Sequence, residues 1–496
     1  MDMVKNLTFS FLALTVLCLW ACNNDDELST NPDLRLEFSA DTLTFDTVFT
    51  QIGSATRILK LFNNNEQSVE IRSISIAGGA NSRFRLNIDG EASNSVQNLI
   101  IPGNDSLYIF GEVTVNPDLP ISESPFVIND AIVFETNGNV QEVVLEAWGQ
   151  NAIYVPDRFS ADSVNIFGCN GGEIVWDDPK PYVIYGVIGF DNCTLVLPAG
   201  AQLYFHGGLT RFTDDDGNIG FYNDGRLIIG PNASLRAEGT FDDPVVLQGD
   251  RLEESFEDLS GQWFGVVFNA GSIGNSMKHT VIKNAIQGII IDSLGSLELS
   301  KTQIFNTSSN GLFARAATVT AENCLFYNNG ATAIRTSLGG NYEFNYCTVG
   351  AFGNDQQSIS LSNGQCLGDF CQEFFANPLN ATMRNCIFFG SNSDQIGLSD
   401  FEVVDFNYNF DHCIVRVEDL LDENNHPDFF DNTNQTLNVD RDAVIFADLN
   451  EDDYHLDTLS VAENLASPII GLELDLDNEM RDVSTPDVGC YEYQNE

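Results

Sequence analysis

Hydrophobic and polar positions repeat with a countable period in residues 275–350. Small residues mark equivalent positions of four successive repeats, at Thr280, Thr302, Cys324 and Cys347. Two more copies follow at Cys386 and Cys413 after longer intervals, which we interpret as repeats that carry loop insertions. These six residues are here called the anchors. A period of about 20 to 25 residues is typical of a solenoid, whose repeats bury their apolar faces only against one another.

Each repeat alternates apolar with polar positions, as in Leu297-Glu298-Leu299. A period of two predicts strands and not helices, so the solenoid is expected to consist of β-strands. Apolar residues lie three positions before and two positions after each anchor, which predicts that the anchors are small residues of the interior.

Turns and a second short strand recur in the same frame. The residues four positions after three of the anchors are Asn284, Asn306 and Asn328, for which we expect left-handed turns whose amides bond to one another. Apolar runs follow a glycine at 288–291 and 311–314. The combination resembles the right-handed parallel β-helix repeat of the broad pectate-lyase-like superfamily, from about Ile153 onward. This resemblance implies an architecture and no particular activity.

Residues 34–150 show longer strands that are separated by turn clusters. Strands are predicted at 56–62, 69–76, 106–115 and 143–148. The turn at 137–139 predicts a hairpin between 131–134 and 143–145. This spacing favours a β-sandwich and resembles bacterial immunoglobulin-like modules. The chain is thus expected to be all-β, with the sandwich at 34–150 and the β-helix at 151–496, including a closing segment from about residue 450.

Residues 1–33 have the features of an export signal. Lys5 precedes an apolar run at 7–19, which is too short to span a bilayer, so residues 1–22 are predicted to be a signal peptide. Its end resembles the bacterial lipobox, which implies acylation of Cys22 and anchoring in the outer membrane; an ordinary signal peptide with a chance cysteine is the alternative. The acidic tether at 23–33 resembles the surface-export signal of Bacteroidetes-type lipoproteins, and periplasmic-facing retention is the alternative to display.

Composition excludes one class of partner and an unfolded chain. The formal net charge is -50, with 22 Lys and Arg against 72 Asp and Glu, which argues against nucleic acid as a partner. A hydrophobic content of 43% with 36 Phe excludes wholesale disorder.

Two acidic clusters, at 214–216 and 475–479, offer oxygen atoms that calcium accepts. Neither follows the full calcium-loop pattern, so solvated turns are the simpler explanation and no metal or cofactor is predicted. The second cluster, with Arg481 and residues 486–492, resembles the closing segment of bacterial surface β-helices, which implies that it caps the open end of the solenoid.

A search for catalytic groups assigns none. β-Helix polysaccharide lyases use an Arg or Lys base near calcium-binding carboxylates, and glycosidases use paired acids. The basic residues Lys283, Lys301, Arg335 and Arg384 form no evident row with Asp292, Glu298, Glu322 and Glu343. The five histidines are scattered without metal-ligand spacing, at His206, His279, His412, His426 and His455. His279 and His412 share one repeat position, which favours a role in a turn.

Cysteines outside the repeat frame predict disulfides in an exported protein. Cys366 and Cys371 lie close together within one insertion, and Cys169 with Cys193 is a weaker candidate pair.

These observations favour a noncatalytic cell-envelope module that binds glycan or a partner protein. One alternative is a polysaccharide lyase or glycosidase whose acidic site is built by loops, near the 350–380 insertion or the Asp214 loop. The other alternative is a rigid structural spacer.

Overall fold

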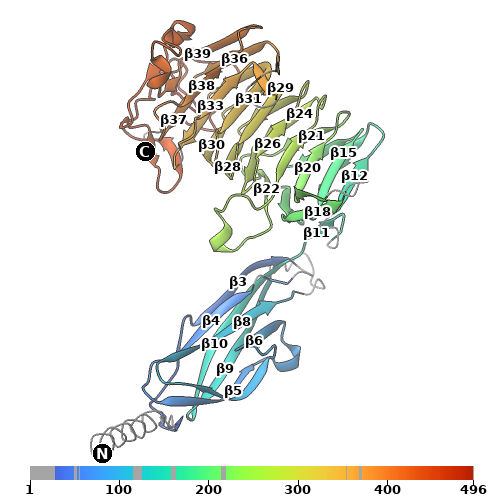
Figure 1. The fold of residues 1–496 in the computed structure, drawn as a ribbon, viewed down its shortest axis with the longest axis vertical. Coiled ribbons are helices and arrows are strands. Elements are labelled where there is room, and N and C mark those ends of the chain that lie inside the picture. Colours follow the sequence, from blue (N-terminus) through green and yellow to red (C-terminus); the bar gives the residue numbers. More distant parts are fainter. Residues whose placement is uncertain are drawn as a thin grey trace, which may run out of the picture. The chain divides into compact units, whose positions relative to one another are not determined.

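The computed structural model describes residues 28–49, 53–54, 56–115, 126–157, 163–213, 219–353, 355–367, 371 and 373–494. The chain divides into two compact units, Met1–Asn151 and Ala152–Glu496 (Figure 1). Both are built from strands, and the described residues contain no α-helix. The short 3-10 helices are η1 (Gly79–Asn81), η3 (Glu254–Phe256), η5 (Asp419–Leu421) and η6 (Phe429–Asn432). The prediction of an all-β chain with a β-sandwich followed by a parallel β-helix is confirmed.

The first unit is a sandwich of two sheets. One sheet has the order β1-β5-β9-β10-β3, with β7 also paired to β5, and the other has the order β2-β4-β8-β6. The strands are β1 (Leu28–Ser29), β2 (Glu37–Phe38), β3 (Thr42–Phe49), β4 (Arg57–Asn63), β5 (Ser68–Ile76), β6 (Phe84–Ile88), β7 (Ser95–Ile101), β8 (Asp105–Val113), β9 (Phe126–Thr136) and β10 (Asn139–Gln150). Phe45 of one sheet contacts Phe84 of the other, with ring centroids 5.3 Å apart. Alternating inward residues of both sheets thus form one core.

The predicted hairpin of this unit is confirmed. Strands β9 and β10 pair antiparallel, with Thr136 opposite Asn139. The two residues between them, Asn137 and Gly138, both have positive φ, at 50° and 79°. Asparagine and glycine adopt this geometry most readily, and a two-residue turn of this hand matches the twist of the strands.

The second unit is a parallel β-helix with three faces (Figure 1). Each coil adds one strand to an 11-stranded sheet, here called face A, and two strands to a 17-stranded sheet. The larger sheet contains two parallel series, here called face B and face C. Strands β29 (Leu312–Glu322) and β31 (Ile334–Asn345) run through both B and C, with a bulge between Arg315 and Ala317 at the corner.

Face A consists of β11 (Ile153–Val155), β14 (Tyr182–Ile184), β17 (Gln202–Phe205), β22 (Val245–Gly249), β25 (Thr280–Lys283), β28 (Gln303–Thr307), β30 (Leu325–Asn329), β32 (Thr348–Ala351), β37 (Ile387–Gly390), β40 (Ile414–Val415) and β42 (Leu437–Asn438). Face B consists of β12 (Val164–Gly168), β15 (Val187–Asp191), β20 (Arg226–Ile229), β23 (Gly265–Phe268), β26 (Ile289–Ile291), the first parts of β29 and β31, β33 (Ile359–Ser362) and β38 (Ile396–Ser399).

Face C consists of β13 (Glu173–Val175), β16 (Thr194–Pro198), β21 (Ser234–Glu238), β24 (Asn275–Lys278), β27 (Ser296–Ser300), the second parts of β29 and β31, β36 (Leu379–Arg384), β39 (Phe406–Asp411) and β41 (Thr433–Asn434). Three antiparallel pairs lie outside the coils: β18 (Leu209–Thr213) with β19 (Ile219–Asn223), β34 (Gly364–Leu367) with β35 (Glu373–Ala376), and β43 (Phe446–Asp448) with β44 (Asp453–Leu456). The pair β34–β35 accounts for the long interval between the fourth and fifth anchors.

The six repeat anchors are all buried, with at most 1% of their surface exposed. Each donates a side-chain hydrogen bond to the carbonyl oxygen two residues earlier, from Thr302 Oγ1 to Ser300 O and from Cys386 Sγ to Arg384 O, for example. The residue between donor and acceptor is left-handed in every copy, and these residues are His279, Lys301, Asn323, Tyr346, Asn385 and His412. Threonine and cysteine both occur at the anchor because both are small and carry a donor that closes this corner. The predicted turn role of His279 and His412 is confirmed.

The asparagines four positions after an anchor do take left-handed turns, but the prediction that they bond to one another is wrong. Asn284 donates to the carbonyl oxygens of Glu257 and Leu259, and Asn306 donates to the Asp258 carboxylate. Asn328 donates to the Asp452 carboxylate. The amides instead hold segments that pass over the outside of the helix, because backbone and carboxylate oxygens lie within reach there.

Residues 439–494, here called the C-terminal segment, pack along the outside of face A. Ile445, Phe446, Tyr454, Leu456 and Cys490 of this segment are buried in one apolar cluster with residues of β30, β37 and β40. Hydrogen bonds tie it to successive coils, from Asn323 to Leu474 O and from Asn385 to Ser467 O. The expectation that it caps the open end is therefore corrected: it covers a lateral face.

The physical reason is the composition of face A. Strands β30 and β37 have apolar side chains at successive positions, as in Ile387-Phe388-Phe389, so both surfaces of this sheet need cover. Gly350 of face A lets the C-terminal segment pack closely, because a Cβ atom there would lie 2.1 Å from the Tyr454 ring. The C-terminal end of the β-helix is covered by other residues. Phe429 of η6 is buried against Phe410, with ring centroids 5.4 Å apart.

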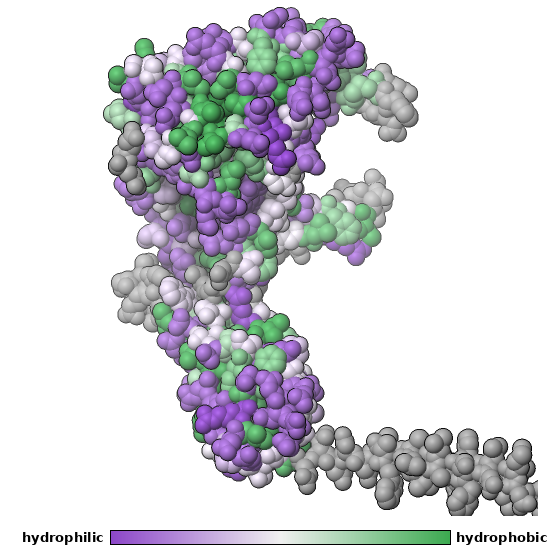
Figure 2. All heavy atoms as spheres, turned by 90° about the vertical axis from the view of Figure 1, so that its left-hand side faces the viewer, coloured by the Kyte–Doolittle hydropathy of each residue, from purple (hydrophilic) through white to green (hydrophobic). Residues whose placement is uncertain are grey.

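The outer surface of the C-terminal segment is partly apolar. Leu459, Ile470 and Val483 are 77%, 99% and 83% exposed. Figure 2 looks at the side on which this segment lies in Figure 1, and it shows apolar side chains gathered within a mostly hydrophilic surface.

Candidate functional site

The outer surface of face B changes character along the helix. Equivalent outward positions in successive coils hold Ile228, Val267, Ile290, Phe313, Arg335, Ser360 and Gly397. Neighbours in this row lie about 4.8 Å apart, the spacing of strands in a sheet. The row is apolar as far as Phe313 and polar or small beyond it, so the later coils present a different surface to solvent.

Two adjoining cavities occupy the later part of face B, with volumes of about 370 and 340 Å³. Ser360 and Ser399 line both of them, so the two form one continuous depression, here called the face B groove. The first cavity is lined by Phe313, Arg315, Arg335, Thr336, Ser337, Ser360, Ser362, Gly364, Gln365, Cys366, Ser399 and Phe401. The second is lined by Gln357, Ser360, Asp394, Ile396, Gly397, Leu398, Ser399, Leu420, Asn425 and His426. Volumes of this size suit a small ligand or a few units of a polymer.

An insertion forms the wall of the first cavity. Residues of strand β34 line the cavity, and a disulfide joins Cys366 to Cys371. Asn363 is fully buried at the base of this insertion, where it donates to Asp400 at 2.7 Å and accepts from the Phe401 N–H at 2.9 Å. Phe401 also contacts Phe374 of β35, with ring centroids 5.3 Å apart. These contacts fix the Phe401 ring as part of the wall.

Two glycines of the groove lie in very close contact with neighbouring side chains. A Cβ atom on Gly364 would lie 2.5 Å from the Phe401 ring, and one on Gly397 would lie 2.2 Å from the Gln357 side chain. Real side chains do not approach so closely, so glycine at these two positions lets the ring and the amide lie against the sheet.

The second cavity is bordered by turns that follow the strands of face A. Ser358 donates to Gln395 at 2.6 Å, and both side chains are fully buried. Asp394 accepts the backbone N–H groups of Glu418 and Leu420, which holds the segment leading to η5 against the sheet. The border is therefore built from bonded side chains and not from a free loop.

Two arginines lie in the first cavity, and they differ in their partners. Arg315 pairs with Asp292, with 2.5 Å between Nη2 and Oδ2. Arg335 is exposed, and its guanidinium carbon lies 5.3 Å from the centroid of the Phe313 ring. Among the described residues, no carboxylate or carbonyl oxygen lies within hydrogen-bonding distance of Arg335.

Carboxylates are scarce in the groove. Of the described lining residues only Asp394 carries one, and its Oδ1 atom already accepts two backbone N–H groups. The paired acids that a glycosidase needs, expected near the 350–380 insertion as one alternative, are not among these lining residues. On face C, Arg384 does approach Glu343 of the preceding coil, at 3.7 Å, a pair that the sequence search did not find.

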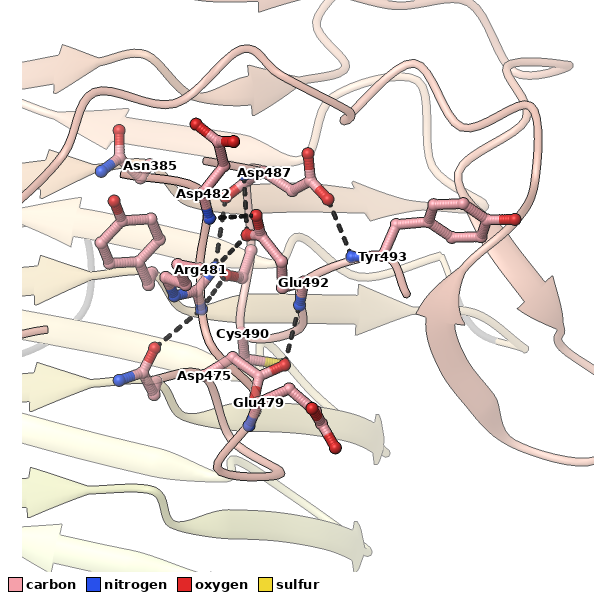
Figure 3. Close-up of polar contacts among 12 residues, drawn as sticks. Asn385, Asp475, Glu479, Arg481, Asp482, Asp487, Cys490, Glu492 and Tyr493 are labelled. Carbon is pink, nitrogen blue, oxygen red and sulfur yellow. Dashed lines mark hydrogen bonds and ion pairs between the residues drawn. The ribbon is translucent and has the colours of Figure 1, made fainter. Parts of the chain in front are cut away.

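A cluster of buried charged residues lies within the C-terminal segment (Figure 3). It consists of Asp475, Arg481, Asp487 and Glu492 and is here called the latch. Arg481 is 3% exposed; its Nη1 donates to Glu492 Oε2 and its Nη2 donates to Asn323 Oδ1 and to the Gly489 carbonyl oxygen. Its guanidinium carbon lies 4.0 Å from the centroid of the Tyr346 ring. The latch thus ties the end of the chain to the third and fourth of the regular coils.

The acids of the latch are occupied by backbone donors. Asp475 accepts the N–H groups of Asp477, Glu479 and Glu492, at 2.8 to 2.9 Å (Figure 3). Burial raises the pKa of Asp475 and of Glu492. The N–H groups of Glu492 and Glu479 lower the pKa of Asp475 in part, and those of Asp482 and Asp487 lower the pKa of Glu492 in part. Both carboxylate oxygens of Asp475 are thus engaged in fixing this turn.

His455 lies between two carboxylates at the surface of this segment. Its Nδ1 is 2.6 Å from Asp453 and its Nε2 is 2.7 Å from Asp477, and its ring lies 4.0 Å from that of Tyr491. The hydrogen bond with Asp477 is the main cause that raises the pKa of His455 to about 9. An imidazolium held on both sides stabilises the segment and has no free nitrogen for acid-base chemistry.

Two other histidines and the buried cysteines also have contacts or burial that fit a structural role. His206 lies 2.8 Å from Asp250 and His412 lies 2.8 Å from Asp411. Burial raises the pKa of the Cys324, Cys347 and Cys386 thiols well above its usual range, so they stay neutral in the interior. In the described part of the chain, no group of three His, Cys, Asp or Glu side chains is arranged to hold a metal ion.

Several predicted positions can now be placed. A disulfide joins Cys169 to Cys193 as well as Cys366 to Cys371. Cys22, residues 23–27 of the acidic tether and the Asp214 loop lie outside the described residues. Within the described residues no helix has both the length and the hydropathy needed to cross a membrane.

Sequence reasoning named Arg335 only as a basic residue without a row of acids. It missed the groove, because the residues that line it come from four coils and two insertions. A signal was present: the outward position of face B, which recurs once in each repeat, changes from Ile290 and Phe313 to Arg335 and Ser360.

No protein-family model matches the chain, and no curated protein matches it. Solved structures that resemble parts of it include a protein of unknown function from Porphyromonas gingivalis W83, at 13% identity and a TM-score of 0.18, over 28% of this chain and 59% of that one. A family 123 glycoside hydrolase from Clostridium perfringens has 6% identity and a TM-score of 0.19, over 53% and 72% of the two chains.

The catalytic unit of a GH87 alpha-1,3-glucanase from Streptomyces thermodiastaticus strain HF3-3 has 10% identity and a TM-score of 0.21, over 73% of this chain and 74% of that one. The present chain thus spans less than two thirds of the Porphyromonas protein, and more of the two hydrolases. Likenesses at these TM-scores assign no function, so the residues of the groove have to support one by themselves.

Proposed function

We propose that this chain is a lipid-anchored protein of the cell envelope whose β-helix binds glycan in the face B groove without cleaving it. One observation carries the proposal: the groove combines aromatic rings, two guanidinium groups and several hydroxyl groups with a single carboxylate among its described lining residues. Rings offer flat apolar surface to the C–H faces of a sugar, and the polar groups fix its hydroxyls.

The position of the groove also supports binding to a polymer. It lies on the outer surface of a stack of parallel strands and is shared by the coils of β29, β31, β33 and β38. Solenoids commonly use such extended surfaces, which allow a chain ligand to contact several repeats at once.

Anchoring rests on residues 1–33. The signal-like run that ends at Cys22 and the acidic tether after it support an acylated protein of the outer membrane, displayed on the surface, with the β-sandwich as a spacer. The Cys22→Ser variant is expected to leave the membrane fraction, and protease added to intact cells should degrade the wild-type protein. Retention of the variant in membranes would argue against the acyl anchor.

Binding is tested with the detergent-solubilised full chain and a panel of immobilised neutral and acidic polysaccharides. Retention on at least one polymer is expected, without release of reducing ends or unsaturated products. The Ser360→Trp variant should lose binding, because Ser360 lines both cavities. Thr382→Trp is the matched control, since Thr382 is an outward residue of face C.

Each alternative has its own outcome in this experiment. Products released from a polymer by the wild-type chain, and lost in Ser360→Trp, would replace the proposal with a lyase or a glycosidase. Failure to retain any polymer would favour a rigid spacer. Equal loss of binding in Ser360→Trp and Thr382→Trp would move the site away from the groove.

A further inference from the structure

Resting on the proposed function, we infer that the face B groove takes a glycan with an isolated acidic group, a carboxylate or a sulfate, which Arg335 binds beside the Phe313 ring. The shared chemistry of the two acids is a planar or tetrahedral oxyanion with at least two acceptor oxygens. A guanidinium donates two parallel hydrogen bonds to such a group.

Arg335 differs from most other described arginines of the β-helix; only Arg226, which lies over the Phe264 ring outside the groove, likewise combines an aromatic contact with no oxygen partner among the described residues. Most of those near a face have an oxygen partner: Arg236 pairs with Glu173, Arg251 with Glu253, Arg315 with Asp292, Arg384 with Glu343, Arg416 with two carbonyl oxygens, and Arg481 with Glu492. Arg335 has only the Phe313 ring among its described contacts. In a chain with 72 acids, a guanidinium without a carboxylate needs an explanation.

The surroundings of Arg335 suit an anionic group of a sugar. The guanidinium carbon of Arg335 lies over the Phe313 ring, and the N–H donors of this guanidinium have no oxygen partner among the described residues. Ser360 lies next to Arg335 in register and Ser399 lines the same cavity, whereas the Ser362 hydroxyl there already donates to Gly364 O. Hydroxyl donors beside an arginine add hydrogen bonds to the remaining oxygens of a carboxylate or a sulfate.

The charges around the groove limit the ligand to few acids. Asp292 neutralises Arg315, so Arg335 supplies the single unpaired positive charge among the described residues of the first cavity. Asp394 lies in the second cavity and disfavours another acid there. The net charge of -50 repels a densely charged polymer over the whole surface. An acid spaced among neutral sugars meets the attraction of Arg335 with the least of this repulsion.

The test uses the full chain and isothermal titration with four small probes: lactose, sialyllactose, monosulfated lactose and trigalacturonate. At least one singly charged probe is expected to bind about tenfold or more tightly than lactose, the gain typical of one charge-assisted hydrogen-bonded pair. Comparison of sialyllactose with monosulfated lactose tells which oxyanion the site prefers. Trigalacturonate, with an acid on every unit, should bind less tightly than the better of the two.

Variants locate the effect. Arg335→Gln should abolish the preference for the acidic probe, since the charged pair is lost. Arg335→Lys should retain part of the preference. Arg384→Gln is the control, because Arg384 is an exposed arginine of face C outside the groove.

The inference and the proposed function fail differently. If lactose and the acidic probes bind equally, or if Arg335→Gln keeps the preference, the inference is overturned while glycan binding stands. Tightest binding of trigalacturonate overturns the requirement for an isolated acid. If no small probe binds but the panel yields a polymer, its carboxyl-reduced or desulfated form decides: equal retention overturns the inference. If nothing binds at all, both ideas fall.

Discussion

The latch and the face B groove each place an arginine against an aromatic ring, yet they use it in opposite ways. Arg481 is 3% exposed and is surrounded by oxygen atoms of Asn323, Gly489 and Glu492 (Figure 3). Arg335 is exposed and has no such oxygen among the described residues. A guanidinium whose terminal nitrogens are hydrogen-bonded inside the protein, as in Arg481, supports structure. A guanidinium without such partners, as in Arg335, is open to a ligand.

The difference also follows from where each arginine lies. The latch crosses a face whose outer surface is apolar and must be covered, so its polar groups become buried and need internal partners. The groove lies on a face that stays in contact with water, which satisfies Arg335 until a ligand arrives. The same residue type therefore serves stability on face A and, in our proposal, recognition on face B.

The largest effect is expected from removing the buried charge of the latch. Arg481→Met keeps the length of the side chain but leaves Glu492 buried without its cation, which should lower the free energy of unfolding by about 3 to 5 kcal/mol. Urea unfolding and limited proteolysis of the C-terminal segment measure the loss.

The double variant Arg481→Met with Glu492→Gln is the control for this prediction. It removes both charges and should recover part of the lost stability, because the uncompensated carboxylate is gone. If Arg481→Met unfolds at the same urea concentration as the wild type, the latch does not stabilise the fold and the contrast with Arg335 collapses.

A smaller, pH-dependent effect is expected at His455. Its pKa in the folded chain is raised to about 9 by Asp477 and Asp453, above the ordinary value of about 6.5. The stabilisation is thus complete below about pH 6.5 and is lost as the pH rises through about 9. Because the side chain is half exposed, solvent screening reduces the expected contribution to about 1 kcal/mol.

The measurement compares the free energies of unfolding of the wild type and His455→Gln at pH 6 and at pH 10. The gap between the two proteins should shrink at the higher pH. An NMR titration of the His455 ring gives its pKa directly, and Asp477→Asn should lower that value. A gap that is the same at both pH values would show that the two ion pairs contribute nothing.

The smallest effect on stability, but a clear one on binding, is expected at Gly364. The methyl group in Gly364→Ala would lie 2.5 Å from the Phe401 ring and should push it out of the wall of the groove. Glycan affinity should fall several-fold, while stability changes by less than about 1 kcal/mol because the groove is open to solvent. Gly208→Ala is the matched control, since no atom lies within 4 Å of the added group.

Titration with the best ligand of the panel, together with urea unfolding, checks both quantities. Unchanged affinity in Gly364→Ala would mean that Phe401 takes no part in binding. A large loss of stability would mean that the wall is structural, as the latch is, and would erase the distinction between the two regions.

Much of the fold was predictable because it depends on local, repeated chemistry. The anchors from Thr280 to Cys413 determine the period, the alternation of apolar residues predicts strands, and Asn137-Gly138 predicts the hairpin. The asparagine turns were predicted in conformation but not in their partners, because conformation depends on the residue itself and partners depend on what passes nearby. The continuous apolar run at Ile387-Phe388-Phe389 is typical of a strand that is buried on both sides, and it is the local pattern that indicates a cover on face A.

The sequence by itself thus determined the coils, their interior and their corners, since each repeat carries the apolar spacing and the small donor that its own stacking needs. Only the tertiary structure decided that the C-terminal segment lies along face A, and that Arg481 finds oxygen partners where Arg335 finds none. Those outcomes depend on residues more than a hundred positions apart, such as Asn323 and Leu474, brought together by packing that no local pattern encodes.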